Sequence, residues 1–495
     1  MPTVLMLAFT GESFVVSDPK GEVFRTLGGV VKSYEYDVIA LNFREPTQSN
    51  FWNPLAVPYS YYKSKEFSKT YEYLSELAKT IFDFSSDDPY WDEQSRTLFI
   101  AISLILFEFG SAEMVNMHNI RVTCERLFDD AISNAKEVRK FVAFLKSRHF
   151  DIYCKIEPIF RNAHVTRLCI LSTFTMNMNI FQKEVVESMM IGNEINYANL
   201  SNKKTAIFLI MPDEKATYHK FVSIFVKQCY DELIATAQDN GGELKRRINF
   251  LLDEFSTIPR IPDIITMLTA ARSRQIRFVL VVQSYSQLKS KYQDDADTIM
   301  ANCANWIYLF SRETELLHKI SVLSGILPNG RPLLNVSQLQ YLEQDAGEAV
   351  VLRRRNRPFI TMLADISDYL DLPLFAKASR KNACVTTHKE KVKYESFDFV
   401  KILLHAKETD GEVMAEIESR IAEIETGDED LNNAIRAEFS RVNTRCDALY
   451  EKLKLYDNFV VRTRKRQKIL GIILGIIFAT LFLGNIVMLW VFAFS

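Results

Sequence analysis

The chain has 495 residues, of which 48% are hydrophobic and 25% are charged. These are ordinary proportions for a folded protein, so a wholly disordered chain is excluded. Lys and Arg number 60 against 62 Asp and Glu, which gives a net charge of −2 and none of the global basic excess typical of nucleic-acid binders. The seven cysteines form no CxxC pair, which argues against a zinc ribbon or a disulfide framework.

Short apolar runs bounded by turn residues recur along the first 352 residues. Largely apolar runs of this length are typical of strands buried on both faces of a parallel sheet, and helical patterns lie between most of them. The alternation predicts an α/β doubly wound fold. The runs are Ser13–Ser17, Val38–Asn42, Ala206–Met211, Ile248–Leu252, Phe278–Val282, Trp306–Phe310 and Ala349–Leu352.

About 160 residues with little strand signal separate the second run from the third, and a loop of that length is implausible. We therefore expect an all-α domain, residues 85–195, inserted between two parts of a nucleotide-binding domain, residues 1–84 and 196–370. The apolar run Leu98–Phe107 is too short to span a membrane and indicates a buried helix.

The C-terminal part has a different pattern. Residues 371–427 are expected to form a polar linker, and residues 428–461 an amphipathic helix whose apolar positions follow a near-heptad spacing. Such a helix can pair as a coiled coil or pack back on the core. Residues 469–494 carry no charge and follow five basic residues, which predicts one transmembrane helix with the bulk of the chain in the cytoplasm.

The strongest chemical motif is the apolar strand Ile248–Leu252 followed by Asp253 and Glu254, which is a Walker B pattern. Asp253 is expected to hold Mg²⁺ directly or through water, and Glu254 to orient or deprotonate a water that attacks a phosphate. The alternative is an acidic pair that only caps the next turn.

Polar and basic residues near the following strand add to this motif. Gln283 follows the strand Phe278–Val282, a position from which a side chain can touch a phosphate or a water. Arg272, near Arg274, can serve as an arginine finger for a neighbouring subunit. The alternative for both arginines is a solvated basic helix end.

Two dense basic clusters are candidates for binding nucleic-acid phosphates without sequence preference. One comprises Arg353, Arg354 and Arg355, with Arg357 beside it, and the other comprises residues 245–247. The alternative is an ordinary solvated edge. The segment Ser17–Glu22, SDPKGE, reads on its own only as a turn after a strand.

Together these segments resemble the type IV secretion coupling proteins, the TraG/TraD conjugation ATPases. The resemblance covers roughly residues 1–370. The segments that carry it are SFVVSDPKGE (13–22), VIALNFREPTQSNFWNPL (38–55), DPYWDEQSRTLF (88–99), NKKTAIFLIMPD (202–213), INFLLDEF (248–255), ARSRQIRFVLVVQSYSQL (271–288), MANCANWIYLF (300–310), RPLLNVSQL (331–339) and VVLRRRNRPF (350–359).

The resemblance implies a RecA-like P-loop ATPase-type sheet with an inserted all-α domain, in a homo-hexamer at the inner membrane. It implies ATP and Mg²⁺ as cofactors, and a relaxase-bound single strand of DNA that passes to the secretion channel. By position, Asp18, Lys20 and Asp253 are expected to contact the cofactor, with Glu254, Arg272 and Gln283 in catalytic roles.

The sequence departs from the family in two respects. It contains no GxxxxGK[ST] loop; the nearest string, residues 325–332, has the glycine spacing without the Lys. It also carries its apolar segment at the C-terminal end. We therefore expect a chain that begins just downstream of its phosphate cradle, through truncation, a misassigned start or a split gene, and that does not hydrolyse ATP as written. The alternatives are a non-hydrolytic, membrane-anchored receptor or adaptor, and a ring translocase of the HerA/FtsK type.

Overall fold

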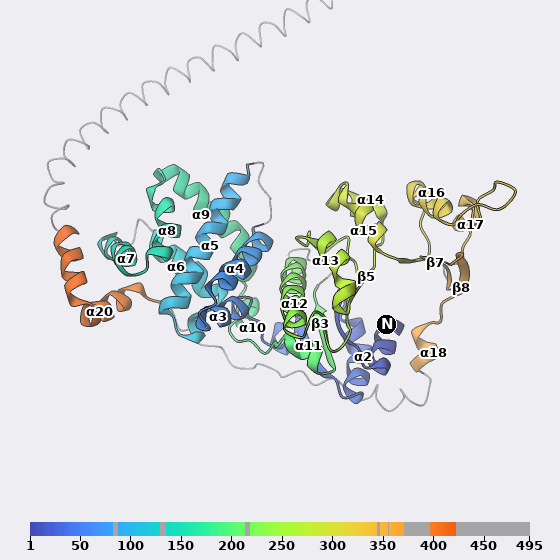
Figure 1. Ribbon diagram of the computed structural model, residues 1–495, viewed down its shortest axis with the longest axis horizontal. Helices are drawn as coiled ribbons and strands as arrows, with labels where there is room; N and C mark the ends of the chain where they lie inside the picture. Colours follow the sequence, from blue (N-terminus) through green and yellow to red (C-terminus); the bar gives the residue numbers. More distant parts are fainter. Residues whose placement is uncertain are drawn as a thin grey trace, which may run out of the picture. The chain divides into compact units, whose positions relative to one another are not determined.

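A computed structural model of the chain describes residues 1–82, 88–128, 135–212, 218–343, 347–354, 356–370 and 397–421. The chain divides into two compact units, Met1–Glu408 and Thr409–Ser495. Figure 1 shows the elements of the first unit, coloured along the sequence. Of the second unit, the described part is helical from residue 411 to residue 421.

The first unit contains a parallel sheet of five strands in the order β2-β3-β1-β4-β5. Every position of β1, β3 and β4 is buried, as expected for strands covered on both faces. The structure thus confirms the predicted parallel α/β sheet. The strands are β1 (Ser13–Asp18), β2 (Asp37–Asn42), β3 (Thr205–Ile210), β4 (Ile248–Leu252) and β5 (Ile276–Leu280).

Helices cover this sheet and connect its strands. The helices α1 (Pro2–Thr10) and α2 (Glu22–Ser33) contact β1, and a core cluster that includes Val4, Leu27 and Phe208 fills the space between helices and sheet. The long helix α12 (His219–Asp239) leads from β3 toward β4, and thirteen of its residues are buried. The remaining helices here are α11 (Ala198–Asn202), α13 (Ile264–Ala271) and the short 3-10 helix η5 (Arg272–Arg274).

A helical region lies between β2 and β3 in the sequence, and α5 (Pro89–Phe109) is its central element, in contact with α4, α6, α8 and α9 (Figure 1). All residues of Leu98–Phe107 except Ile100 are buried in α5, as predicted. The proposed boundary at residue 85 lies outside the described residues. The other helices are α3 (Ala56–Lys63), α4 (Phe67–Ile81), α6 (Met117–Phe128), α7 (Ala135–Arg148), α8 (Phe150–Arg161), α9 (His164–Met178) and α10 (Glu184–Met189), with η1 (Pro46–Gln48), η2 (Ala112–Met114) and η3 (Asn179–Phe181).

The last two predicted strands do not join the parallel sheet, and this part of the prediction is wrong. They form β6 (Asn305–Tyr308) and β7 (Glu348–Arg353) of a separate antiparallel sheet with β8 (Phe359–Met362). Only five residues separate β7 from β8, and a connection of that length permits antiparallel pairing alone. The helices α16 (Thr314–Leu323) and α17 (Val336–Gln340) pack on this sheet through a small core that includes Leu317, Leu339 and Val350. The helices α14 (Tyr285–Tyr292) and α15 (Asp295–Asn302) contact each other, and α15 also contacts α13. The short helix α18 (Ile366–Leu370) packs against the core of the parallel sheet.

The region expected to be a linker contains a helix, α20 (Phe399–Thr409), which the sequence interpretation missed. The Phe399 ring packs against the Phe141 ring of α7 in a tilted arrangement at a centroid distance of 5.6 Å, and the Phe397 amide donates to Asn119 Oδ1 at 3.3 Å. These contacts join α20 to the helical region. The predicted segments 428–461 and 469–494 lie outside the described residues, and among the helices that are described none is both long and apolar enough to cross a bilayer.

Candidate functional site

The acidic pair Asp253–Glu254 lies where β4 ends, at the carboxyl edge of the parallel sheet. Both residues are half-buried. The Ser17 hydroxyl at the end of β1 donates to the Asp253 carbonyl at 3.0 Å, and the Glu254 amide donates to Asp253 Oδ1 at 3.0 Å. Glu254 has a positive φ of 52°, which turns the chain sharply after the strand. The two carboxylates therefore lie at the sheet edge, as the Walker B pattern predicts.

Gln283 is brought to the same place from the neighbouring strand β5. Its Nε2 donates to Glu254 Oε1 at 3.0 Å. Backbone hydrogen bonds join the ends of β4 and β5. The Val281 amide donates to the Leu252 carbonyl at 3.0 Å, and the Phe255 amide donates to the Val281 carbonyl at 2.9 Å. A carboxylate oriented by an amide donor can position a water molecule for attack. The sequence interpretation predicted this grouping of Asp253, Glu254 and Gln283.

Asp18 ends β1 beside β4, but its side chain faces the helix that follows. Its Oδ2 accepts the Phe24 amide of α2 at 2.8 Å, and its carbonyl accepts the Gly21 amide at 3.1 Å. Burial raises the pKa of Asp18, and the backbone amides of α2 oppose that rise. Gly21 has a φ of 69°, and a Cβ there would lie 3.2 Å from Ile210. Lys20 is exposed on this turn.

The first turn of α1 lies near the same edge. Burial lowers the pKa of the Met1 amine, while the negative charges of Asp253 and Asp18 oppose that change. Because α1 runs back along β1, its N-terminal amides and the positive end of its dipole approach the carboxyl edge. This edge therefore combines half-buried carboxylates with a helix N-terminus.

Arg272 lies away from the acidic pair. It is exposed in η5, before β5 begins, whereas Gln283 follows the end of β5. A strand of this length spans about 16 Å, so Arg272 is at the opposite edge of the sheet. Arg274 is fixed there, because its Nη1 donates to the Gly242 carbonyl at 2.6 Å.

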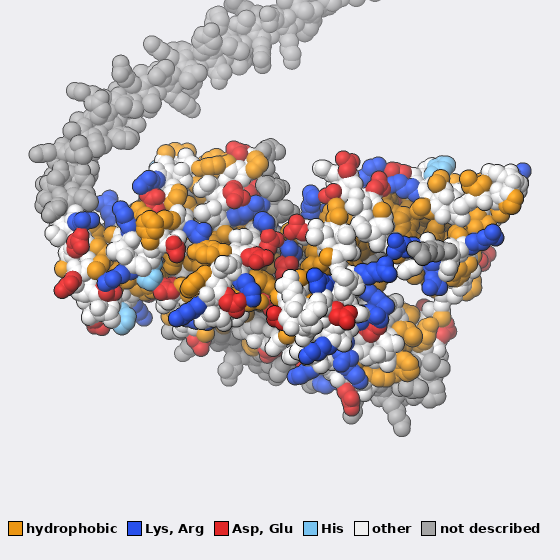
Figure 2. Space-filling view, viewed as in Figure 1, with side chains coloured by type: hydrophobic (Ala, Val, Ile, Leu, Met, Phe, Trp, Pro, Cys, Tyr) orange, Lys and Arg blue, Asp and Glu red, His pale blue; other side chains and the backbone are white. Residues whose placement is uncertain are grey.

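The two basic clusters differ in their surroundings. Arg353 ends β7 and Arg354 follows it, and both are exposed; Arg355 lies outside the described residues. By contrast, Arg246 Nη1 donates to the Gly11 carbonyl at 2.5 Å, and Arg247 pairs with Glu12 at 2.8 Å. Figure 2 shows Lys and Arg side chains near α2 and α11, among acidic and polar groups. The second cluster thus holds the sheet edge together.

Glu313 is a residue at the site that the sequence interpretation missed. Its carboxylate accepts the Ser284 hydroxyl at 2.6 Å and the Tyr285 amide at 2.8 Å, directly after Gln283. Burial would raise the pKa of Glu313, but these hydroxyl and amide donors hold it below its ordinary value. Glu313 therefore fixes the first turn of α14. No spacing in the sequence signals a contact between segments 29 residues apart.

The donor set fits a magnesium ion bound through water better than one held in a cage of protein ligands. Within the described part of the chain, no group of three or more His, Cys, Asp and Glu side chains is placed to hold a metal ion. Magnesium commonly binds through one or two carboxylates, keeping several waters. Asp253 and Glu254 supply such carboxylates.

Comparison with known proteins places this geometry in a family. A family model described as type IV secretory system conjugative DNA transfer matches residues 1–327. Protein VirD4 of Agrobacterium fabrum is 21% identical over 382 residues, which cover 70% of this chain and 54% of VirD4. Protein VirD4 of Rhizobium rhizogenes is also 21% identical over 382 residues, covering 70% of this chain and 53% of that protein. The chain spans about half the length of these curated relatives.

Solved structures show the same fold. The conjugative coupling protein TrwB, in a trigonal form with sulphate, superposes with a TM-score of 0.55 at 15% identity, over 73% of this chain and 80% of that chain. TrwB in complex with ADP and Mg²⁺ gives the same TM-score, identity and coverage. With its family match over residues 1–327 and its acidic pair at the carboxyl edge of a parallel sheet, the chain belongs to the coupling proteins of type IV secretion that serve conjugative DNA transfer.

Proposed function

We propose that the carboxyl edge of the parallel sheet is the magnesium-binding part of a nucleotide site, which would power transfer of single-stranded DNA with its bound relaxase once a phosphate-binding loop completes it. The observation that carries this proposal is the contact of Gln283 with Glu254, beside Asp253. When bound, the magnesium ion would neutralise phosphate charge. Asp253 would hold it through water, and Glu254, oriented by Gln283, would accept a proton from an attacking water. Binding of ADP and Mg²⁺ by TrwB supports this assignment.

The position of Arg272 suits a role between subunits. An arginine at the amino edge is remote from its own Asp253, but in a ring of identical subunits it can reach the neighbour's nucleotide and stabilise charge on the phosphates. We therefore assign Arg272 as the arginine finger of a homo-hexamer. Asp18 and Lys20 remain proposed cofactor contacts, with Asp18 acting through the α2 turn that it caps.

The DNA contacts are assigned to the exposed arginines after β7. Arg353 and Arg354 are exposed, and with Arg355 they provide charge for a phosphate backbone. Segment 469–494 would anchor the protein in the inner membrane, with channel components of the secretion system as partners.

Nucleotide binding tests the proposal. Titration calorimetry of the purified full chain with ADP is expected to show binding that strengthens when Mg²⁺ is added. Asp253→Asn should remove this Mg²⁺ dependence. Asp37→Asn is the matched control, because Asp37 is an exposed carboxylate at the amino end of β2. Equal Mg²⁺ dependence in Asp253→Asn and wild type would contradict the site.

A further inference from the structure

Residues 255–263 come directly after Glu254, and we name them the post-strand segment. This segment lies along one face of α12. Side chains four residues apart lie on the same face of a helix, so His219, Ser223 and Lys227 of α12 can all contact one neighbouring segment. All three contacts bind the post-strand segment to α12. They join His219 Nδ1 to Thr257 Oγ1 at 3.2 Å, Ser223 Oγ to the Pro259 carbonyl at 2.8 Å, and Lys227 Nζ to Asp263 Oδ2 at 3.6 Å.

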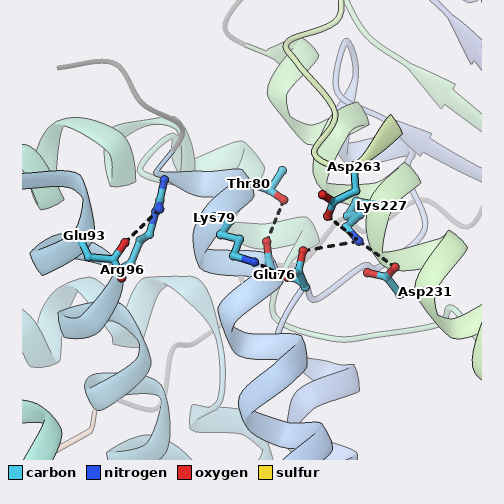
Figure 3. Close-up of polar contacts among 8 residues, drawn as sticks. All are labelled: Glu76, Lys79, Thr80, Glu93, Arg96, Lys227, Asp231 and Asp263. Atoms are coloured by element: carbon cyan, nitrogen blue, oxygen red, sulfur yellow. Dashed lines mark hydrogen bonds and ion pairs between the residues drawn. The ribbon is translucent and has the colours of Figure 1, made fainter. Parts of the chain in front are cut away.

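Lys227 is the last of these residues and is shared among three carboxylates. Only 8% of Lys227 is exposed, and its Nζ lies 3.0 Å from Asp231 Oδ1, 3.5 Å from Glu76 Oε2 and 3.6 Å from Asp263 Oδ2 (Figure 3). Burial alone would lower the pKa of Lys227, but the carboxylates raise it. A buried cation of this kind is retained only where anions surround it.

The three carboxylates come from different elements. Asp231 lies on α12 itself, Glu76 on α4 of the helical region, and Asp263 at the start of α13. One ammonium group thus joins the segment after Glu254 to a helix of the helical region. In the same crevice, side chains of α4 and α12 lie together, among them Tyr73, Leu77 and Ile224.

From Glu76 the contacts continue into the helical region. The carbonyl of Phe82, at the C-terminal end of α4, accepts Arg96 Nε at 3.1 Å and Arg96 Nη2 at 2.7 Å. Arg96 is a buried residue of α5, the central helix, and its Nη1 pairs with Glu93 (Figure 3). These bonds connect the C-terminal end of α4 to α5.

The three ion pairs are unequal. The Asp263 side chain is 58% exposed, whereas those of Glu76 and Asp231 are 21% and 22% exposed. Solvent weakens an exposed pair, so Asp263 can leave while Lys227 keeps its two less exposed partners. Of the three ion pairs, the one with Asp263 is therefore the one that breaks most readily.

We propose that Lys227 is a conformational link, which couples the position of the post-strand segment, through Asp263, to the stability of α4 in the helical region. The biological role of this link rests on the proposed function, since the link would transmit the state of the nucleotide site to the helical region between β2 and β3. The physical link requires no nucleotide. A chain that failed to bind nucleotide would contradict the proposed function, whereas the experiment below addresses the link by itself.

Hydrogen exchange of the full chain, read by mass spectrometry on peptides from α4, tests the link. Thr257→Val loosens the post-strand segment, because it removes the hydroxyl that contacts His219 and the Glu254 carbonyl. We expect exchange in α4 to accelerate about two- to thirtyfold, the range of coupling through packed networks. The acceleration should vanish when Thr257→Val is combined with Asp263→Asn, which suits the positive φ of 55° at this position.

Lys79→Met is the matched control. Lys79 also pairs with Glu76, at 2.7 Å, but its partner lies on its own helix. The effect of Thr257→Val on α4 should persist in the Lys79→Met background. The link is overturned if Thr257→Val leaves α4 unchanged, or if it accelerates exchange equally with and without Asp263→Asn.

Discussion

Substitutions of Asp18 can distinguish a structural role of its carboxylate from a role in ligand binding. Asp18 is 2% exposed, and its carboxylate accepts the Phe24 amide at 2.8 Å, in the first turn of α2. Asp18→Ala removes this acceptor and leaves the part-buried Phe24 amide unpaired, at a cost of about 1–3 kcal/mol. Removal of a helix-capping side chain alone costs about 0.5–2 kcal/mol, so we expect Asp18→Ala to lower the free energy of unfolding by about 2 kcal/mol.

Asp18→Asn separates the acceptor from the charge. The amide oxygen can still accept from Phe24, and the cost of burying a charge disappears, so we expect a loss below about 1 kcal/mol. Burial raises the pKa of Asp18, which is consistent with a carboxylate whose charge is held at some cost.

Native-state hydrogen exchange of peptides from β1 and α2 measures this difference. A loss of ~2 kcal/mol in the free energy of local opening corresponds to exchange roughly thirtyfold faster at the start of α2 in Asp18→Ala. Asp37→Ala, at an exposed position on β2, should leave these peptides unchanged. Unaltered exchange in Asp18→Ala, or equal acceleration in Asp18→Asn, would refute the capping role.

The charges of Asp231 and of Arg353 and Arg354 can be tested by substitution. Burial raises the pKa of Asp231 to about 6, so between about pH 4 and pH 6 the unfolded chain loses this proton more readily than the folded chain. As the pH rises through this window, the wild type should therefore lose about 1–3 kcal/mol of stability relative to Asp231→Asn. The opening free energy of α12 measures this, and a difference between the two proteins that does not change with pH would contradict it. Arg353→Ala combined with Arg354→Ala should flatten the plot of log affinity for single-stranded DNA against log salt by about 1.4, since each phosphate contact contributes about 0.7. An unchanged slope would remove these arginines from the DNA interface.

The sequence was sufficient to predict the parallel sheet because burial on both faces leaves a continuous apolar run. The runs at β1, β3 and β4 carry this signal. It fails for β6, which is buried only at its last position and pairs in the antiparallel sheet. A short apolar run does not show which strand it pairs with, so β6 was assigned to the wrong sheet and β8 was missed.

The site was predictable from the sequence only where strand order alone places its residues. Asp253, Glu254 and Gln283 were predicted to meet because parallel strands end at one edge, and chain order alone places them there. The roles of Asp18 and Glu313 depend on where a side chain points after the strand ends, and no periodicity in the sequence encodes that. The Lys227 cluster joins α4, α12 and the start of α13, which are remote in the sequence, so only the folded chain reveals it.

The most direct test of the magnesium–nucleotide site is to map where a metal ion binds. Fe²⁺ can replace Mg²⁺ and, with ascorbate and peroxide, cleaves the backbone near its binding site. With ADP present, cuts are expected near Asp18, between Leu252 and Phe255 and near Gln283, and they should disappear in Asp253→Asn. Cleavage confined to other segments, or identical cuts in that variant, would contradict a nucleotide-dependent metal site at the carboxyl edge of the sheet.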